Sequence, residues 1–117
     1  MVTFEEFLAI GLSLPETTER PTWGESTLRV GEKVLAIGSA EAGAVSVKAS
    51  KADQAELLAA EPEVFSFAPY VGRFGWVRIR LDLVDPAELR DLLTEAWRRT
   101  APRRLVKAFD AVNPPPL

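Results

Sequence analysis

Hydrophobic residues near the start of the chain recur at helical spacing. Thr3 followed by Glu6 is a capping-box pair, in which each side chain accepts a hydrogen bond from the other residue's backbone N–H. The apolar positions on one helical face are Phe4, Phe7 and Leu8. This pattern predicts a helix over residues 4–12, and Pro15 prevents it from continuing.

Two further segments carry helical signals. Ser50 with Asp53 predicts a helix that runs to about residue 60. A longer helix is predicted after Asp85, because a proline occupies its first position. Its apolar stripe consists of Leu89, Leu92, Leu93, Ala96 and Trp97. Pro102 kinks or restarts this helix, and residues 105–109 continue an amphipathic pattern.

Alternation of apolar and polar residues predicts the strands. They cover residues 26–30, 33–37, 44–48, 64–67 and 76–81. Gly31-Glu32 is typical of a two-residue hairpin turn. Pro21 restricts residues 16–23 to an edge strand or an extended loop. The connections within residues 26–48 are too short for parallel crossovers, so we expect antiparallel pairing.

These elements indicate an α+β fold. We expect a twisted antiparallel sheet of about five strands, a meander plus a returning strand, with helices packed mainly on one face. The length of 117 residues fits one domain. We expect this domain to span residues 1–112, and residues 113–117 to form a proline-rich mobile tail.

The chain contains neither cysteine nor histidine. This composition excludes thiolate chemistry, an imidazole base and a Cys/His zinc site, and we expect no metal and no cofactor. Helix capping or helix-surface positions explain the neighbouring acids Asp82, Asp85, Asp91 and Glu95, so we expect no enzyme. No apolar run approaches the ~20 residues of a membrane span, and the first residues lack a signal-peptide pattern. We therefore expect a cytoplasmic protein with no membrane partner.

The net charge of −3 argues against a surface that attracts phosphate throughout, but the cations are unevenly distributed. Strand alternation places a basic set on the sheet face opposite Val77 and Ile79. This basic face consists of Arg29, Lys48, Arg78 and Arg80. It either follows a phosphate backbone or is an ordinary solvated face. A second cluster is either a solvated helix end or a source of further phosphate contacts. It consists of Arg98, Arg99, Arg103, Arg104 and Lys107.

Residues 68–76 form a loop that is rich in glycine and aromatic residues. The candidate ligand-binding residues, which include one earlier tryptophan, are Trp23, Tyr70, Gly72, Gly75 and Trp76. Aromatic rings can stack on a base or another flat ligand, and Arg73 can reach a phosphate. The alternative is a wing-like turn whose aromatic side chains fill the core.

Four segments in order carry a resemblance to a known family. The first is Leu14-Pro15 together with residues 21–24, and the second is residues 29–34 together with Val47-Lys48. The third is residues 68–77, and the fourth is residues 89–93 together with Ala96-Trp97. The third is the most specific, because it contains the string Pro-Tyr-x-Gly-x-x-Gly-Trp over residues 69–76. Together these segments resemble the MmcQ/YjbR family of small bacterial domains, over roughly residues 14–100.

The resemblance implies an α+β double-wing arrangement and a DNA-binding role, a label that rests on fold similarity to a phage transcription factor domain. It implies no catalytic residue. Members typically carry histidine where this chain has Phe74, so the resemblance implies no ionisable group at that position. We therefore expect a non-enzymatic DNA-binding protein that contacts phosphates through the basic face and the loop. A protein-interaction module that uses the sheet face or the aromatic loop is the alternative, and a small-ligand pocket beside the loop is a third.

Overall fold

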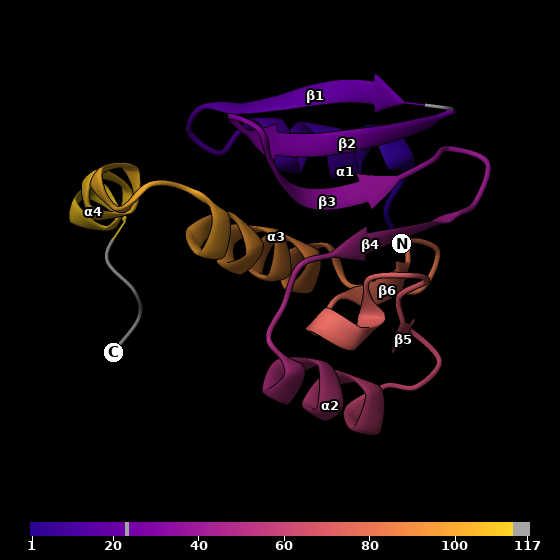
Figure 1. Ribbon diagram of the computed structural model, residues 1–117. Coiled ribbons are helices and arrows are strands. Elements are labelled where there is room, and N and C mark those ends of the chain that lie inside the picture. Colours follow the sequence, from indigo (N-terminus) through magenta and orange to yellow (C-terminus); the bar gives the residue numbers. More distant parts are fainter. Residues whose placement is uncertain (23, 114–117) are drawn as a thin grey trace.

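The computed structural model describes residues 1–22 and 24–113 as one antiparallel sheet with helices (Figure 1). The sheet has six strands in the order β1-β2-β3-β4-β6-β5. They are β1 (Thr17–Thr22), β2 (Glu25–Val30), β3 (Lys33–Gly38), β4 (Ala44–Val47), β5 (Phe65–Phe67) and β6 (Val77–Arg80). The helices are α1 (Phe4–Leu12), α2 (Lys51–Ala60), the 3-10 helix η1 (Gly72–Phe74), α3 (Pro86–Thr100) and α4 (Arg103–Val112). Trp23 and most of the predicted tail, residues 114–117, lie outside the described residues.

The predicted α+β class is confirmed, with one difference in the sheet. About five strands were expected and six are present, because the segment left open between an edge strand and a loop, residues 16–23, pairs as the edge strand β1. β1 pairs with β2, and β5 pairs with β6. Pro21 lies in the outermost strand β1, where its missing N–H leaves no gap inside the sheet.

After β4, the chain adds the edge strand β5 before the inner strand β6. Strands β1 to β4 form a meander in which each strand pairs with the next. α2 then leads to β5 at the far edge, and β6 returns between β4 and β5. The loop of residues 68–76 connects β5 to β6, so it lies at the end of the strand that carries Arg78.

Capping side chains fix the helix starts that the sequence predicts. The Thr3 hydroxyl accepts from the Glu6 N–H at 3.0 Å, and the Glu6 carboxylate accepts from the Thr3 N–H at 3.0 Å. These two bonds satisfy N–H groups that have no partner inside the helix. Asp85 caps α3 in the same way, accepting from two backbone N–H groups.

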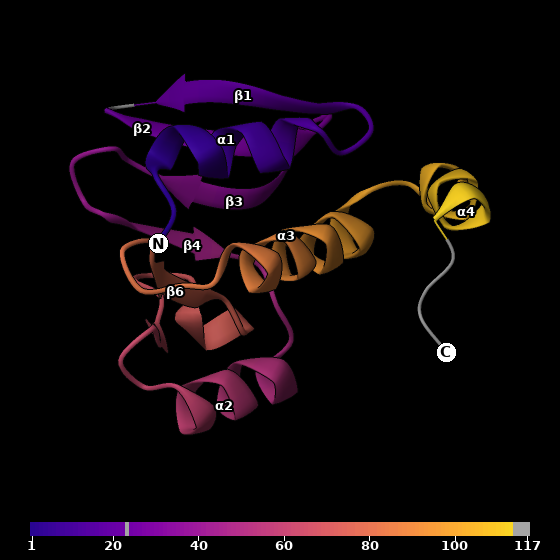
Figure 2. The same ribbon diagram turned by 180° about the vertical axis from the view of Figure 1, so that it is seen from behind.

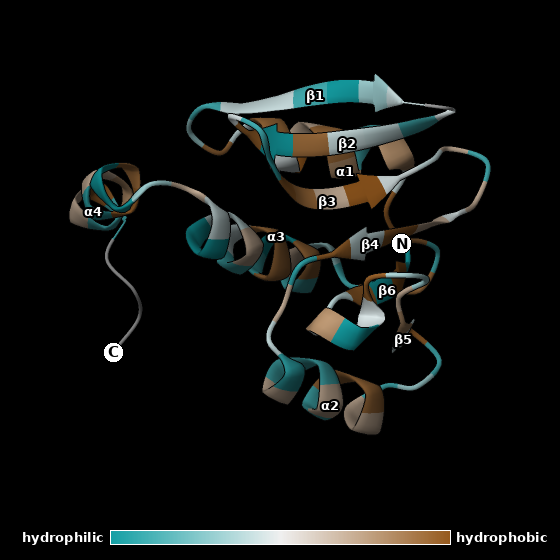
Figure 3. Ribbon diagram, in the orientation of Figure 1, coloured by the Kyte–Doolittle hydropathy of each residue, from teal (hydrophilic) through white to brown (hydrophobic). Residues whose placement is uncertain are grey.

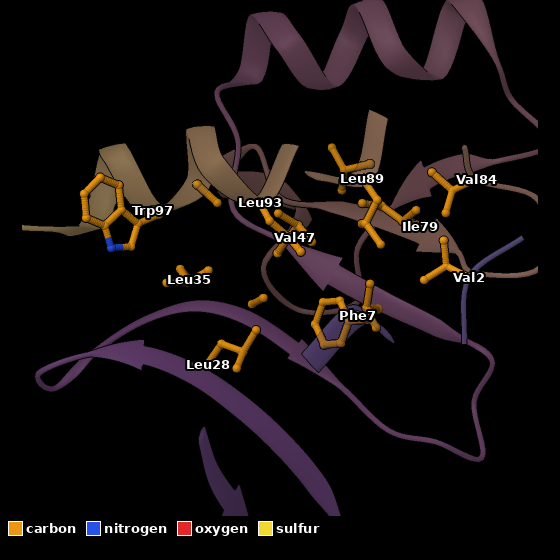
Figure 4. Packing of buried hydrophobic residues seen from close by; sticks show 14 of the residues in the cluster. Val2, Phe7, Leu28, Leu35, Val47, Ile79, Val84, Leu89, Leu93 and Trp97 are labelled. Carbon is orange, nitrogen blue, oxygen red and sulfur yellow. The ribbon is translucent and has the colours of Figure 1, made fainter. Parts of the chain in front are cut away.

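α1 and α3 cover one face of the sheet, behind it in Figure 1 and in front of it in Figure 2. The strand residues facing them form a row across four strands: Leu28, Ala36, Val47 and Val77. All four are buried. Figure 4 shows Leu28 and Leu35 facing Leu93 and Trp97 of α3. Leu35 and Ala36 are both fully buried because the register shifts between Leu28 and Arg29, and a β-bulge turns consecutive side chains towards one face.

The exposed edge and the interior of the sheet differ in hydropathy. In Figure 3, β1 is coloured mostly teal to white, whereas β3 and β4 are largely brown, the colour of hydrophobic residues. α4 lies apart from the sheet and has no buried residue. It is held to α3 by an Arg98–Asp110 ion pair at 2.8 Å and by the Phe109 ring, 5.0 Å from the Trp97 ring. Within residues 1–22 and 24–113, no helix has both the length and the apolar composition needed to cross a membrane.

Candidate nucleic-acid interface

The face opposite α1 and α3 carries a row of side chains that crosses all six strands and is polar except at Ile37. The paired residues along this row are Arg20, Thr27, Ile37, Ser46, Arg78 and Ser66. Their side chains point away from the helices, because successive residues of a strand point to opposite faces and their neighbours Leu28, Val47 and Val77 are in the core. Arg78 is therefore at the centre of the β4–β6–β5 half of this face.

The other predicted cations surround this row. Arg80 lies two residues after Arg78 and opposite Ala44, so both arginines project from the same face of β6. Lys48 directly follows the end of β4. Arg29 is in β2, where it lies opposite Val34 of β3. Strands β2 and β6 are separated by three strand spacings, about 14 Å. The four cations are thus spread over the face and are not gathered at one point.

Two arginines of this face are held by carboxylates. Both terminal nitrogens of the Arg20 guanidinium donate to the Glu32 carboxylate at 3.2 Å, and the Arg80 guanidinium donates to the Asp82 carboxylate at 2.7 and 3.2 Å. The hydrogen bonds from Arg20 lower the pKa of the Glu32 carboxyl, and the bond from Arg80 lowers the pKa of the Asp82 carboxyl. Both acids are therefore ionised at neutral pH and offset the charge of their partners.

Arg29 is also engaged, although by uncharged groups. Its Nε donates to the Thr27 hydroxyl at 2.9 Å, and one terminal nitrogen donates to the Glu32 carbonyl oxygen at 3.5 Å. For Lys48, Arg73 and Arg78, the described part of the chain supplies no carboxylate within ion-pair distance. Among the five predicted phosphate-binding cations, these three have neither an ion pair nor a side-chain hydrogen bond within the described residues.

The loop of residues 68–76 is fixed against the start of α2. The buried Gln54 side chain donates its Nε2 to the carbonyl oxygens of Gly72 at 2.8 Å and Trp76 at 2.7 Å. Gly75 has a φ of +105°, and a Cβ there would come within 2.7 Å of the Ala49 carbonyl oxygen. The loop backbone thus lies directly on the residues that follow Lys48, which brings Lys48, Gly75 and the beginning of β6 together.

The aromatic residues of the loop divide into buried and exposed ones. Trp76 is only 8% exposed, so it belongs to the packing of the loop. Tyr70 is 95% exposed and has a φ of +64°, an uncommon conformation for a residue other than glycine. Phe74 is also exposed, with the Arg73 guanidinium 4.8 Å from its ring centre. Trp23 lies outside the described residues.

The C-terminal basic cluster is mostly paired. Arg98 bonds Glu95 and Asp110, Arg99 bonds Asp53, and Arg104 contacts Glu16. The ion pairs explain the cluster as part of the fold. Lys48, Arg73 and Arg78 have no such pairs among the described residues. The residues described here contain no group of three or more acidic side chains arranged to hold a metal ion.

A cleft of about 300 Å³ lies between α2 and α3. Its floor is apolar, formed by Val47, Val77 and Ile79, which face away from Arg78. None of the candidate loop residues from Tyr70 to Trp76 lines this cleft. The cleft is therefore on the helix-covered side of the sheet, and it adjoins the basic face at Lys48, which lines it at the end of β4.

Three contributors to the site have no clear signal in the sequence. Gln54 is one polar residue in a helix, 18 and 22 positions before the residues it bonds. Arg20 joins the row of Arg78 only because β1 pairs as an edge strand. Phe67 is 57% exposed although it lies two residues after the core residue Phe65 in the same strand, and its ring packs beside Gly72 at the base of the loop.

Comparisons with known proteins agree with this fold. The crystal structure of Deinococcus radiodurans protein DR2400, with domain DUF419, superposes with a TM-score of 0.79 at 20% identity, covering 99% of this chain and 91% of that one. The uncharacterized proteins Rv2570 of Mycobacterium tuberculosis and Mb2600 of Mycobacterium bovis are 40% identical over 53 residues. Those matches cover 45% of this chain and 41% of each relative. The YjbR family model matches residues 12–99. The chain therefore belongs to the YjbR family, as the motif of residues 69–76 had indicated.

Proposed function

We propose that this chain is a non-enzymatic DNA-binding protein whose helix-free sheet face contacts the phosphate backbone. The observation that carries this proposal is the set Lys48, Arg73 and Arg78, three cations without an ion-pair partner among the described residues. Uncompensated cations on one face bind phosphates and release the counterions condensed on DNA. Arg29 and Arg80 extend the contact area on either side. The role implied by the family resemblance supports the same function.

The same features favour weak sequence selectivity. Contacts to phosphates position a protein on DNA but do not report the bases. Sequence is commonly read by a helix or ribbon that enters the major groove, whereas α1 and α3 pack their apolar residues against the sheet. We therefore expect affinity that depends strongly on salt and little on base composition.

A salt titration of DNA binding tests the proposal. Fluorescence anisotropy with a labelled oligonucleotide measures affinity between about 50 and 200 mM salt, a range over which phosphate contacts weaken markedly. Arg78→Ala, Lys48→Ala and Arg73→Ala should each reduce the slope of log K against log salt by about one. Arg103→Ala is the matched control, because Arg103 is an exposed cation of α4, away from the sheet. Absence of binding even at about 50 mM salt contradicts the proposal.

A protein-interaction module is a second candidate, favoured by the 95% exposure of Tyr70. Large exposed aromatic side chains are frequent anchors of protein interfaces. A pull-down distinguishes the two functions. Protein docking is favoured over DNA binding if the double variant Arg78→Ala/Arg80→Ala still retains a protein partner and the variant Tyr70→Ala loses it.

A further inference from the structure

Exposed aromatic side chains cluster around the loop of residues 68–76. Tyr70 is 95% exposed, Phe74 60% and Phe67 57%. Isolated exposed apolar residues are ordinary on protein surfaces. Here, three of the seven large exposed hydrophobic residues in the described chain fall within eight consecutive positions. Such a concentration is typical of a binding surface.

The surface is held in one conformation before any partner arrives. Gln54 bonds both ends of the segment from Gly72 to Trp76, and Gly75 packs on the backbone of α2's first turn. Tyr70 keeps a positive φ although its ring is almost fully exposed. A preformed surface loses little conformational freedom on binding, so its aromatic rings are suited to contacting a flexible partner.

Cations accompany these rings. The Arg73 guanidinium lies 4.8 Å from the centre of the Phe74 ring. Lys48 directly precedes the Ala49 backbone against which Gly75 packs, and Arg78 lies two residues after the end of the loop. Aromatic rings next to uncompensated cations match the alternating bases and phosphates of a single strand. In a duplex the bases are already stacked on each other and are not available to these rings.

We propose that Tyr70 and Phe74 stack on unpaired bases, so that the protein binds single-stranded DNA in preference to duplex DNA. This inference rests on the proposed phosphate contacts of Lys48, Arg73 and Arg78. It adds a base-stacking surface to them and thereby specifies the form of DNA. Because every base presents a flat face, this contact requires no particular sequence.

The test compares a single-stranded oligothymidine of about 15 nucleotides with a duplex of the same length, within the range of site sizes of single-strand-binding proteins. We expect Tyr70→Asn and Phe74→Ser each to weaken single-strand binding about tenfold, and to change duplex binding less than twofold. Leu83→Ser is the matched control, because Leu83 is an exposed hydrophobic residue outside the loop. Thermal denaturation establishes that each variant is folded.

A direct readout of stacking is also accessible, because Tyr70 is the one tyrosine of the chain. Its ring protons should shift upfield in NMR spectra when oligothymidine is added, as a stacked base lies over them. This inference is overturned if the protein binds duplex and single-stranded DNA with equal affinity, if neither aromatic variant changes that affinity, and if the Tyr70 ring protons do not shift. That outcome leaves the proposed phosphate contacts intact. Loss of binding to both DNA forms in the unmodified protein instead overturns the proposed function itself.

Discussion

Gln54 in α2 donates a 2.7 Å hydrogen bond to the carbonyl oxygen of Trp76, 22 residues later, at the point where the loop becomes β6. The same nitrogen bonds the Gly72 carbonyl oxygen. One side chain therefore satisfies two backbone acceptors, and it is itself buried. Unsatisfied buried acceptors are costly, so we expect this residue to contribute to holding the loop against α2.

Replacing Gln54 with leucine should destabilise the fold. The variant Gln54→Leu removes the donor from the Trp76 carbonyl oxygen, while the Gly72 carbonyl oxygen keeps its bond from the Gly75 N–H, and we expect a cost of about 2 kcal/mol. Chemical denaturation measures the free energy of unfolding. Glu56→Gln, an exposed change in the same helix, should alter it by less than about 0.5 kcal/mol. Equal stabilities of the two variants would show that Gln54 does not hold the loop.

Gly75→Ala should be more damaging than the same change in a hairpin turn. Gly31 and Gly75 both have positive φ, +62° and +105°. A methyl group at Gly31 meets no atom within 4 Å, so Gly31→Ala should lose about 1 kcal/mol from backbone conformation alone. At Gly75 the methyl group would also press on the Ala49 carbonyl oxygen and the Lys51 nitrogen. Thermal or chemical denaturation of both variants should rank Gly75→Ala clearly below Gly31→Ala.

Tyr70→Asn should leave the protein as stable as before or more stable. The Tyr70 ring is 95% exposed and contributes little packing, while its φ of +64° is tolerated better by asparagine. We expect a gain of up to about 1 kcal/mol in the free energy of unfolding. A melting temperature well below that of the unmodified protein would instead reveal packing around the ring.

Asp82→Asn should strengthen DNA binding. Asp82 holds Arg80 through two hydrogen bonds and remains ionised because Arg80 lowers its pKa. Removing the carboxylate releases Arg80 to bind phosphate, and the salt slope should steepen by about one counterion. The salt-titrated anisotropy assay measures this slope. The equivalent change at an acid distant from the face, Asp91→Asn, should leave it unchanged, and a slope that does not respond to Asp82→Asn would remove Arg80 from the contact area.

The α1 capping box should appear in the titration of Glu6. The hydrogen bond from the Thr3 backbone N–H is the main cause that lowers the pKa of the Glu6 carboxyl. A carboxyl whose pKa is lowered by folding stabilises the fold at neutral pH, and this contribution is lost as pH falls through the lowered value. An NMR titration should give Glu6 a pKa below the usual glutamate range. Thr3→Ala, which removes the other half of the box, should move that pKa upwards.

The elements of the fold are largely predictable from local patterns. The capping box at Thr3, the Asp85–Pro86 helix start and the Gly31-Glu32 turn all act over a few residues, and such signals are present in the sequence itself. The sixth strand was harder to predict because Pro21 left residues 16–23 open to an edge strand or a loop, and β1 forms only through its pairing with β2. Isolated short strands have no stability of their own.

The site was predictable only in part, because some of its properties depend on contacts between residues that are distant in the sequence. Alternation along β6 places Arg78 and Arg80 on the face away from the core, because that property belongs to a single strand. Which cations are neutralised depends on partners distant in sequence, as for Arg20 with Glu32. The burial of Trp76 and the exposure of Tyr70 likewise follow from how the loop folds back on α2.

The position of β6 between β4 and β5 has a kinetic consequence. β1, β2 and β3 each pair with the next strand in the sequence. The other edge of β4 pairs with β6, which comes after α2, β5 and the loop of residues 68–76. The N-terminus closes over a still longer distance, since Val2 donates its N–H to the Leu81 carbonyl oxygen. Non-local pairings of this kind slow folding. During synthesis, the edge of β4 therefore has no partner strand until residues 77–80 have emerged.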